Sequence, residues 1–566
     1  MAASSPLTQA RPVLPDRFYY LNNFQAVLDW LEDRYADVLG AADLGFIRCF
    51  RTQPRPARAL LTRMAMRRST LFRESSLRYE EIGDTVTALA PLVEAGWVEA
   101  DAELDLAELF RVLRKPELAA LFALPPALAR LPKPQWLAWL APGAAQGRRA
   151  SQWGAPERIH RLSCAALCER LRLTYFGNFR QDWSDFVLAD LGVFRFERID
   201  CGRDARAFQT TRQVEVFQAL YRCRENLHEQ VPPREVLAQL PPAIEDSGWL
   251  ERRRQKLLFR IAQRFESQRE PEAALELYSQ CRWPGTSLRR ALLEERAQRP
   301  GAARALCESG LALRREGAHH HSLRRVLARI ARREGAPPAS RSMTRIATQT
   351  VELPPPSTPI RVEQAMIAHL QAESPDSRVE WVENALLNSL FGLLCWEAIF
   401  APLPGAFFHP HHHGPADLGE DDFVQRREHL FSRCLDTLES GAYASLIRDR
   451  FRDRQAVQSP FVAWAAIDES LLELALACIP AAHLRIVFQW MLRDLPGHCA
   501  GFPDLVQFWP SGRRYRMVEI KGPGDRLQEN QRRLLEHCVA QGLPVSVLNV
   551  RWRDPPADAA AGSAHP

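Results

Sequence analysis

The sequence predicts a multidomain protein that is mainly α-helical and ends in an α/β domain. Its 566 residues exceed what one hydrophobic core can hold, since domains usually comprise about 150 residues. Apolar residues recur at helical spacing from Phe18 to Leu39 and again from Trp249 to Gly335. From Gly501 to Val550 the pattern instead predicts two strands, a helix and a third strand.

Composition and local pattern restrict the class of protein. Hydrophobic residues make up 46% and charged residues 25% of the chain, which is typical of a folded globular protein and argues against disorder or a fibre. The longest mainly apolar stretch, Ala385 to Cys395, is shorter than the roughly 20 residues that span a bilayer, so no membrane partner is expected. The N-terminus has no apolar secretory signal, and the 12 cysteines are scattered singly. These features predict a cytoplasmic protein without a structural zinc site.

Lysine is rare in this chain. Basic residues number 74 and acidic residues 68, and the net charge of +6 is too small to prove a polyanionic partner. Only four of the basic residues are lysines, namely Lys115, Lys133, Lys256 and Lys521. Arginine does not replace lysine where the chemistry requires a compact amine. Each lysine within a motif is therefore informative.

The first segment with a DNA-binding pattern runs from Leu60 to Ala100. A helix flanked by arginines, a second helix ending near Gly96 and a short apolar exit are typical of a helix-turn-helix with a small wing. A plain helical hairpin is the alternative. Arg67 and Arg68, beside the first of these helices, are predicted to bind DNA phosphates.

The next segment, Leu104 to Ala141, holds two short amphipathic helices on either side of a Pro-rich turn. Lys133 stands at the start of the second helix, and the arrangement resembles a SAP-type DNA-binding motif. Lys133 is therefore a predicted phosphate contact. A solvated helix face is the alternative explanation of the same pattern.

A helical solenoid is predicted between Trp249 and Gly335. The pattern REPEAALELY recurs loosely as QRPGAARALC, and in each copy a proline that begins a helix is followed by paired alanines that permit close packing. The repeat is similar to, but shorter than, a tetratricopeptide repeat. The many arginines of this segment form either a solvated face or a track for DNA phosphates.

Changes in composition place the boundaries between these segments. Residues 336–359 are rich in Pro and Ser, with one strand-like run in the middle, and predict a boundary between domains. The tail after Asp554 lacks the apolar content to fold. The predicted divisions are a helical, winged-helix-like domain at 1–100, a SAP-like helical DNA-binding region at 101–245, a tetratricopeptide-like solenoid at 246–340, a linker at 341–360, an α/β domain at 361–554 and a disordered tail at 555–566.

Two carboxylates and an amine are predicted to converge in the α/β domain. Asp504 opens the first strand directly after Pro503, and Glu519 and Lys521 close the second strand after a turn at Pro510. Side chains two residues apart in a strand lie on the same face. The hairpin therefore returns Glu519 and Lys521 to the side of Asp504. A surface hairpin with an ordinary Glu/Lys ion pair is the alternative.

This combination of side chains suits metal-dependent hydrolysis of a phosphodiester. Carboxylate oxygens bind Mg²⁺ or Mn²⁺, and one or two such ions activate water and stabilise charge on the phosphate. The amine of Lys521 would position the attacking water or balance the phosphate charge. Asp504, Glu519 and Lys521 are therefore the predicted catalytic residues, and Mg²⁺ or Mn²⁺ is the predicted cofactor.

The order and spacing of Asp504, Glu519 and Lys521 match the PD-(D/E)xK nuclease signature. The segment from Gly501 to Val550 resembles a VRR-NUC nuclease domain, and its stretch VEIKGPGDRLQENQ is similar to the Fanconi-associated nuclease family. The N-terminal segments also follow the order found in that family. The resemblance implies a restriction-endonuclease-like fold for the C-terminal domain. It further implies that the carbonyl of Ile520 is a metal ligand and that Gln531 supports the site.

The resemblance also implies a metal ligand far upstream of the hairpin. The stretch VENALLNSLFGLLCWEAIF is similar to a helix of that family whose glutamate joins the metal site. Matching its LFGLLCWEAIF portion identifies that glutamate as Glu383. Glu380 and Glu397 lie on or near the same segment and are the alternatives.

As a bacterial member of that family, the chain is expected to be a structure-selective DNA nuclease. The resemblance implies 5′-flap endonuclease and 5′–3′ exonuclease activity in interstrand crosslink repair. It also implies that the partner is branched DNA and that the protein associates with the nucleoid in the cytoplasm. The N-terminal region shows no Cys/His cluster, so a ubiquitin-binding zinc finger is not expected. The alternatives are a Holliday-junction resolvase and a DNA-binding scaffold with an inert nuclease domain. The oligomeric state does not follow from the sequence.

Overall fold

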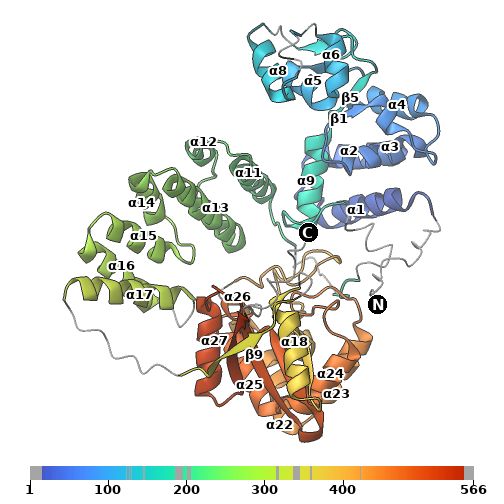
Figure 1. Cartoon of the computed structure of the whole chain (residues 1–566). Coiled ribbons are helices and arrows are strands. Elements are labelled where there is room, and N and C mark those ends of the chain that lie inside the picture. Colours follow the sequence, from blue (N-terminus) through green and yellow to red (C-terminus); the bar gives the residue numbers. More distant parts are fainter. Residues whose placement is uncertain are drawn as a thin grey trace, which may run out of the picture. The chain divides into compact units, whose positions relative to one another are not determined.

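The computed structural model describes residues 16–553 except for 123, 126–127, 129, 144–146, 184, 186–194, 200–205, 314–317, 336–344, 357–359 and 421. These residues pack as two compact units (Figure 1). The first unit comprises the chain up to Tyr221 together with Phe408–His411, and the second unit comprises the rest. The predicted disordered tail, 555–566, lies outside the described residues.

The first unit begins with a helix-turn-helix fold. Its helices bury aromatic side chains such as Tyr20, Phe24 and Phe50, and an antiparallel sheet of order β1-β5-β2 forms the wing. The elements are α1 (Tyr19–Tyr35), α2 (Ala41–Thr52), α3 (Arg55–Ala65), β1 (Leu71–Arg73), α4 (Thr85–Glu94), β2 (Val98–Glu99) and β5 (Ile159–Leu162). The predicted helix-turn-helix with a small wing is confirmed. Its central strand, β5, was not predicted, because it comes from a segment beyond the next module.

The SAP-like module is inserted between strands β2 and β5. It packs around Trp136, whose side chain is buried, and Asp105 with Glu108 forms a capping box at the start of α5. The elements are β3 (Glu103–Leu104), α5 (Leu106–Val112), α6 (Lys115–Leu121), α8 (Lys133–Leu140) and β4 (Arg148–Arg149). The first predicted helix is divided into α5 and α6. The division has a physical reason, since Pro116 is favoured in the first turn of a new helix and disfavoured inside one.

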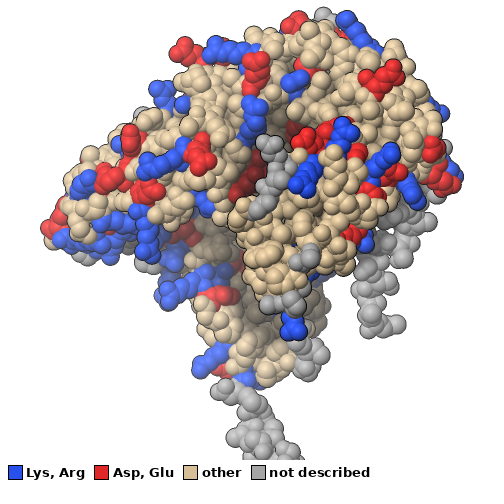
Figure 2. Space-filling view, turned by 90° about the horizontal axis from the view of Figure 1, so that it is seen from above, with Lys and Arg blue, Asp and Glu red and all other residues tan. Residues whose placement is uncertain are grey.

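The predicted solenoid is a stack of five helices in the second unit, in which each helix packs against the next. Pro271 and Pro300 begin helices, as the repeat predicts. In Figure 2 the solenoid lies on the left, where basic side chains gather together with acidic ones. Several of its arginines are paired, for example Arg329 and Arg333 with Glu295. The connecting helices and the stack are α9 (Ala165–Phe176), α11 (Thr211–His228), α12 (Pro233–Ala238), α13 (Gly248–Ser267), α14 (Pro271–Ser279), α15 (Thr286–Arg296), α16 (Pro300–Leu313) and α17 (Ala318–Arg333).

A five-stranded mixed sheet of order β6-β10-β9-β8-β7 forms the centre of the C-terminal domain. β10 runs parallel to both β6 and β9, whereas β8 runs antiparallel to both β9 and β7. Helix α18 buries Met366 and Leu370 against one face, and α27 contacts β10. The elements are β6 (Thr348–Leu353), α18 (Val362–Glu373), β7 (Arg378–Trp381), β8 (Leu505–Trp509), β9 (Arg514–Lys521), α27 (Glu529–Ala540) and β10 (Val545–Trp552).

The structure differs from the sequence prediction at the start of this domain. The predicted linker, 341–360, contains β6, which pairs along its full length with β10. Val351 and Leu353 of β6 are buried in the same core as α18. The strand-like run in the middle of this Pro- and Ser-rich segment is therefore a strand of the sheet rather than part of a linker.

Eight helices connect β7 to β8 in the described part of this domain. They bury most of the predicted apolar stretch from Ala385 onward. The elements are α19 (Ala385–Leu394), α20 (Trp396–Ile399), α21 (Phe423–Arg426), α22 (Glu428–Ser440), α23 (Tyr443–Asp453), α24 (Glu469–Cys478), α25 (Ala481–Arg493) and α26 (Leu495–His498). Within the described ranges no single helix has the length and apolarity to cross a bilayer, and one bent pair, α24 with α25, reaches them only in combination.

Candidate active site

The predicted catalytic residues meet where strand β8 begins and strand β9 ends. Leu505 lies opposite Val518, so the last residues of β9 extend beyond the start of β8. Asp504 lies just ahead of β8, and its Oδ2 accepts a hydrogen bond from the Ile520 N–H at 2.8 Å. The hairpin therefore brings Asp504 next to the end of β9 that carries Glu519, as the sequence pattern predicts.

The loop before Asp504 is held by two groups that sequence reasoning missed. The Asn384 Oδ1 accepts hydrogen bonds from the Gly501 N–H at 2.9 Å and the Phe502 N–H at 3.0 Å. Gly501 has a φ of +91°, and a Cβ at this position would lie 3.0 Å from the backbone nitrogen of Gln531, so glycine is required here. The glycine ahead of the Pro-Asp pair was a readable signal of a tight turn. Asn384 lies 117 residues before Gly501 and gives no local signal.

Glu519, Lys521 and Gln531 form one hydrogen-bonded group. The Glu519 Oε1 lies 2.8 Å from the Lys521 Nζ and accepts a hydrogen bond from the Gln531 Nε2 at 2.6 Å. The Gln531 Oε1 accepts from the Lys521 Nζ at 3.1 Å and from the Gln528 N–H at 3.0 Å. Gln531 belongs to the first turn of α27, so this helix positions the amine. The Glu519 Oε2 is buried and has no hydrogen-bond partner among the residues that the structure describes.

Burial disfavours the charged form of both carboxylates. Burial, followed by the charge of Asp504, raises the pKa of Glu519 to about 7. Burial also raises the pKa of Asp504. Negative charge on Glu383 raises the pKa of both groups, and Glu363, in the first turn of α18, adds to the effect on Asp504. Glu363 is a fourth acidic residue near the site that sequence reasoning missed. A divalent cation would relieve the repulsion between these groups.

Glu383 lies ahead of helix α19 rather than within it, which differs from the helix that the resemblance implies. Its φ is +38°, a left-handed conformation. The N–H groups of Glu383 and Val382 donate to the carbonyl of Asp504 at 3.0 and 2.9 Å. The left-handed conformation is incompatible with a continuous helix through Glu383, and the two bonds fix the backbone of Glu383 relative to Asp504.

Neither alternative to Glu383 has the same relation to the two carboxylates. The Glu380 carboxylate pairs with Arg378 at 2.5 Å, and that of Glu397 pairs with Arg450 at 2.6 Å. The Glu397 side chain is 70% exposed. Of the three, Glu383 is the residue whose charge acts on both Asp504 and Glu519. The geometry thus favours Glu383 as the upstream ligand.

The donor set fits a hard divalent cation such as Mg²⁺ or Mn²⁺. The strongest observation is the buried, unpartnered Oε2 of Glu519, because buried polar atoms normally have partners. A residue in an antiparallel strand pair directs its N–H and C=O to the same side, so the Ile520 carbonyl faces Asp504 as its N–H does. No three His, Cys, Asp or Glu side chains in the described ranges stand close enough to hold a metal by themselves. A cation would therefore also take the backbone carbonyl, phosphate oxygens or water as ligands.

The three predicted DNA-binding residues belong to the first unit, whereas the carboxylates belong to the second. Arg67 and Arg68 are exposed. The Lys133 amine donates to the carbonyls of Phe110 and Leu113 at 2.9 and 2.5 Å, so it caps the C-terminal end of α5. Sequence reasoning missed this structural role, because the cap is formed by segments that are distant in the chain.

Comparison with known proteins identifies relatives of the whole chain. Three family profiles match: "FAN1, HTH domain" at residues 18–99, "Fanconi anemia-associated nuclease SAP domain" at 103–153 and "VRR-NUC domain" at 438–552. The chain is 48% identical over 551 residues to a Fanconi-associated nuclease 1 homologue of Pseudomonas aeruginosa, covering 97% of this chain and 98% of that protein. It is 22% identical over 609 residues to an Arabidopsis thaliana homologue, covering 95% of this chain and 67% of that protein.

Two solved structures are similar over nearly the full length. One is a crystal structure of paFAN1 bound to a gapped DNA with a 2-nucleotide 5′ flap, with a TM-score of 0.91, 48% identity and coverage of 96% of this chain and 100% of that one. The other is paFAN1 bound to a gapped DNA with a 1-nucleotide 5′ flap, with a TM-score of 0.89, 48% identity and coverage of 95% and 100%.

Proposed function

This chain belongs to the Fanconi-associated nuclease family, and from that premise we propose that it is a metal-dependent nuclease that cuts 5′-flap DNA next to the junction. The observation that carries the proposal is the group of Asp504, Glu519 and Lys521, with a buried Glu519 oxygen that has no partner in the described residues. The choice of substrate is supported by the 5′-flap DNA bound in the two similar crystal structures.

The carboxylates of Asp504, Glu519 and Glu383 and the carbonyl of Ile520 are the proposed ligands of Mg²⁺ or Mn²⁺. A bound ion of this kind supplies Lewis acidity toward the phosphate and lowers the pKa of water. Glu519 is buried, Asp504 is partly buried and Glu383 is exposed. Strand pairing and the bonds to Asn384 hold the backbone that carries Asp504. The backbone that carries these charges is fixed before DNA arrives, and the side chains complete the ligand set when the ion binds.

Lys521 is the proposed group that contacts the attacking water or a phosphate oxygen. A lysine amine has three N–H donors, and two of them are directed at the Glu519 Oε1 and the Gln531 Oε1. The third is available to the substrate. Gln531 therefore acts as a positioning residue, since its amide holds the amine and the carboxylate together.

For the DNA-binding surface, Arg67 and Arg68 are the proposed phosphate contacts of the helix-turn-helix, because both are exposed. Lys133 would have to give up its two helix-capping bonds to bind phosphate. Its proposed contribution to DNA binding is therefore to hold α5 and α8 together.

The finer proposals follow from the family. They are a 5′–3′ exonuclease activity, a place in interstrand crosslink repair, and action on flaps and junctions at the bacterial nucleoid in the cytoplasm. The proposed cofactor is Mg²⁺ or Mn²⁺, as one ion or two.

The decisive experiment compares cleavage of a labelled 5′-flap duplex, a 3′-flap duplex and a four-way junction in Mn²⁺. We expect wild-type protein to cut the 5′ flap and Asp504→Ala to leave it intact while still binding it. Preferential cutting of the four-way junction would support a Holliday-junction resolvase instead. Binding without cutting by the wild type in Mn²⁺ would support an inert scaffold.

The upstream ligand can be assigned with matched variants. We expect Glu383→Gln to lose cleavage, because it removes a proposed metal ligand. Glu380→Gln and Glu397→Gln remove acidic side chains of the same segment that pair with arginines instead, and we expect both to retain cleavage. Loss of cleavage in either control alone would transfer the assignment to that residue.

A further inference from the structure

Trp381 and Ile360 are among the few large apolar side chains that are exposed in the described part of the chain. Trp381 is 48% exposed and Ile360 is 43% exposed. The guanidinium of Arg361 lies 5.3 Å from the centroid of the Trp381 ring, within cation–π distance. Covering an exposed aromatic ring is energetically favourable. An exposed ring with a cation beside it is therefore a surface suited to a flat, electron-rich partner.

Trp381 lies next to the candidate active site along two paths. It is the last residue of β7 and pairs with Leu505, the residue after Asp504. The next two residues, Val382 and Glu383, donate their N–H groups to the Asp504 carbonyl. Trp381 also shares a strand face with Val379, which α18 covers. Its ring therefore lies at the same end of the sheet as the carboxylates and beside the first turn of α18, on the face that α18 covers. Strand alternation directs Asp504, Glu519 and Lys521 to the opposite face of that end.

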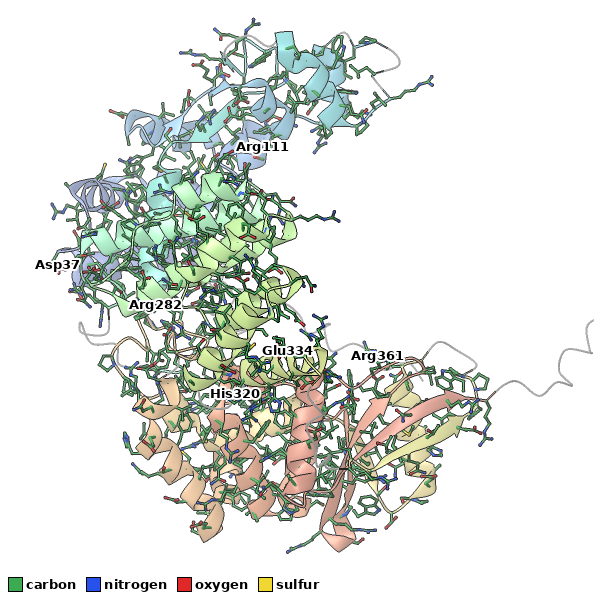
Figure 3. All side chains as sticks on the ribbon, turned by 90° about the vertical axis from the view of Figure 1, so that its left-hand side faces the viewer. Asp37, Arg111, Arg282, His320, Glu334 and Arg361 are labelled. Carbon is green, nitrogen blue, oxygen red and sulfur yellow. The ribbon has the colours of Figure 1, made fainter. Side chains whose placement is uncertain are left out.

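Arg361 lies at the same end of the sheet, at the start of α18. It is the residue ahead of α18, and Val362, the next residue, faces Gly522, which follows Lys521. Figure 3 labels Arg361 beside the strands of this sheet. The guanidinium and the indole thus stand together at the end of the sheet that carries the acidic centre, and the positive charge there attracts a DNA backbone.

The distances suit a nucleobase near the reacting phosphate. Residues that pair across antiparallel strands have Cα atoms about 5 Å apart, and nucleotides of one strand follow one another about every 3.4 Å. A base within about three nucleotides of a phosphate at the carboxylates is therefore within reach of the Trp381 ring. Aromatic side chains bind bases by stacking, whatever the base sequence.

We propose that Trp381 stacks on a DNA base within about three nucleotides of the scissile phosphate, where the strand passes the end of the sheet, and that Arg361 holds the ring and contacts the neighbouring backbone. This proposal rests on the proposed nuclease function and adds a residue that positions the substrate. The stacked base would anchor the strand against the carboxylates, so that the phosphate is presented to Lys521 in a fixed register.

The experiment combines protein variants with substrates that lack single bases. Wild type, Trp381→Ala and Trp381→Phe cleave a 5′-flap duplex and matched duplexes with one abasic nucleotide at each position flanking the cleavage site. We expect Trp381→Ala to lower kcat/KM about tenfold on the intact duplex, the loss expected when one stacked base is released. Trp381→Phe keeps a flat ring and should retain most of the activity. On the duplex that lacks the stacked base, wild type and Trp381→Ala should be equally slow.

Trp139→Ala is the matched control, because Trp139 is an exposed tryptophan of the SAP-like module. Any loss that it causes should be the same on intact and abasic duplexes. An equal loss for Trp381→Ala on all duplexes, or no loss on any, would overturn the proposal. The first result would assign Trp381 to packing or to another partner.

A second measurement separates this proposal from the proposed function. 2-Aminopurine is placed in turn at each nucleotide near the flap junction, and its fluorescence is recorded with bound protein in Ca²⁺ in place of Mn²⁺. Stacking predicts quenching at one position by the wild type and its loss in Trp381→Ala. The absence of quenching at every position would overturn stacking even if the wild type cleaves. Failure of the wild type to cleave would instead overturn the proposed function, and the fluorescence would still decide the role of Trp381.

Discussion

Replacing Glu519 by glutamine is expected to stabilise the metal-free protein at alkaline pH while abolishing cleavage. Glu519 is fully buried, and its pKa is raised from 4.5 to about 7 by burial and by the charge of Asp504. The folded protein therefore holds this proton in a pH range where the unfolded chain has lost it. The free energy of unfolding then falls as pH rises from about 4.5 through about 7, since the folded state binds more protons than the unfolded state in that range.

The size of the effect follows from the same two values. A change in pKa from 4.5 to about 7 corresponds to ~3 kcal/mol against the ionised form at pH well above 7. Glutamine keeps the oxygen that accepts hydrogen bonds from Lys521 and Gln531, and it removes the charge. We therefore expect no stability difference near pH 4.5 and a gain of up to ~3 kcal/mol for Glu519→Gln at pH 8. For a domain of roughly 200 residues this gain raises the melting temperature by about 6–12 °C.

The assay is thermal unfolding of the full chain in EDTA from pH 5 to pH 9. Glu380→Gln is the matched control, because its carboxylate pairs with Arg378 outside the cluster and no alkaline gain is expected. Addition of Mn²⁺ should raise the melting temperature of the wild type more than that of Glu519→Gln, since a ligand stabilises the state that binds it. The reasoning is refuted if Glu519→Gln is no more stable than the wild type at pH 8 in EDTA.

Three further predictions concern the same site. At limiting Mn²⁺, the wild-type cleavage rate should rise with pH through about 7. The reason is that the raised pKa of Glu519 lets protons compete with the cation below that pH. A flat rate profile from pH 5.5 to 8.5 would contradict this prediction. Lys521→Arg should slow single-turnover cleavage by about 100-fold or more with flap binding unchanged. The reason is that a planar guanidinium does not fit the place of the amine between Glu519 and Gln531. Cleavage at the wild-type rate would refute the catalytic role of the Lys521 amine. Asn384→Ala should destabilise the domain by about 1–3 kcal/mol, because two buried N–H groups lose their acceptor; urea unfolding measures this, and Asn384→Asp, which keeps the acceptor, should lose less.

The sequence by itself determined the arrangement of Asp504, Glu519 and Lys521. These residues belong to one hairpin, and strand alternation with a short turn is enough to place them on one side. The helix-turn-helix, the helical repeats and the mixed C-terminal domain also follow from periodicity, because each element is encoded by neighbouring residues. Resemblance added Gln531 and Glu383, and the structure places Gln531 on Lys521 and the charge of Glu383 near both carboxylates.

Only the tertiary structure decided what depends on residues that are distant in the chain. Three contacts join separate segments: the bonds that Asn384 accepts from the loop before Asp504, the capping bonds of Lys133, and the cation–π contact of Arg361 with Trp381. The raised pKa of Glu519 likewise exists only after folding, because burial and the approach of Asp504 create it. Periodicity records which face of an element is apolar, but it does not record which other element will cover that face. For this reason the catalytic pattern could be found in the sequence. The groups that position the catalytic side chains and shift their pKa values became visible only in three dimensions.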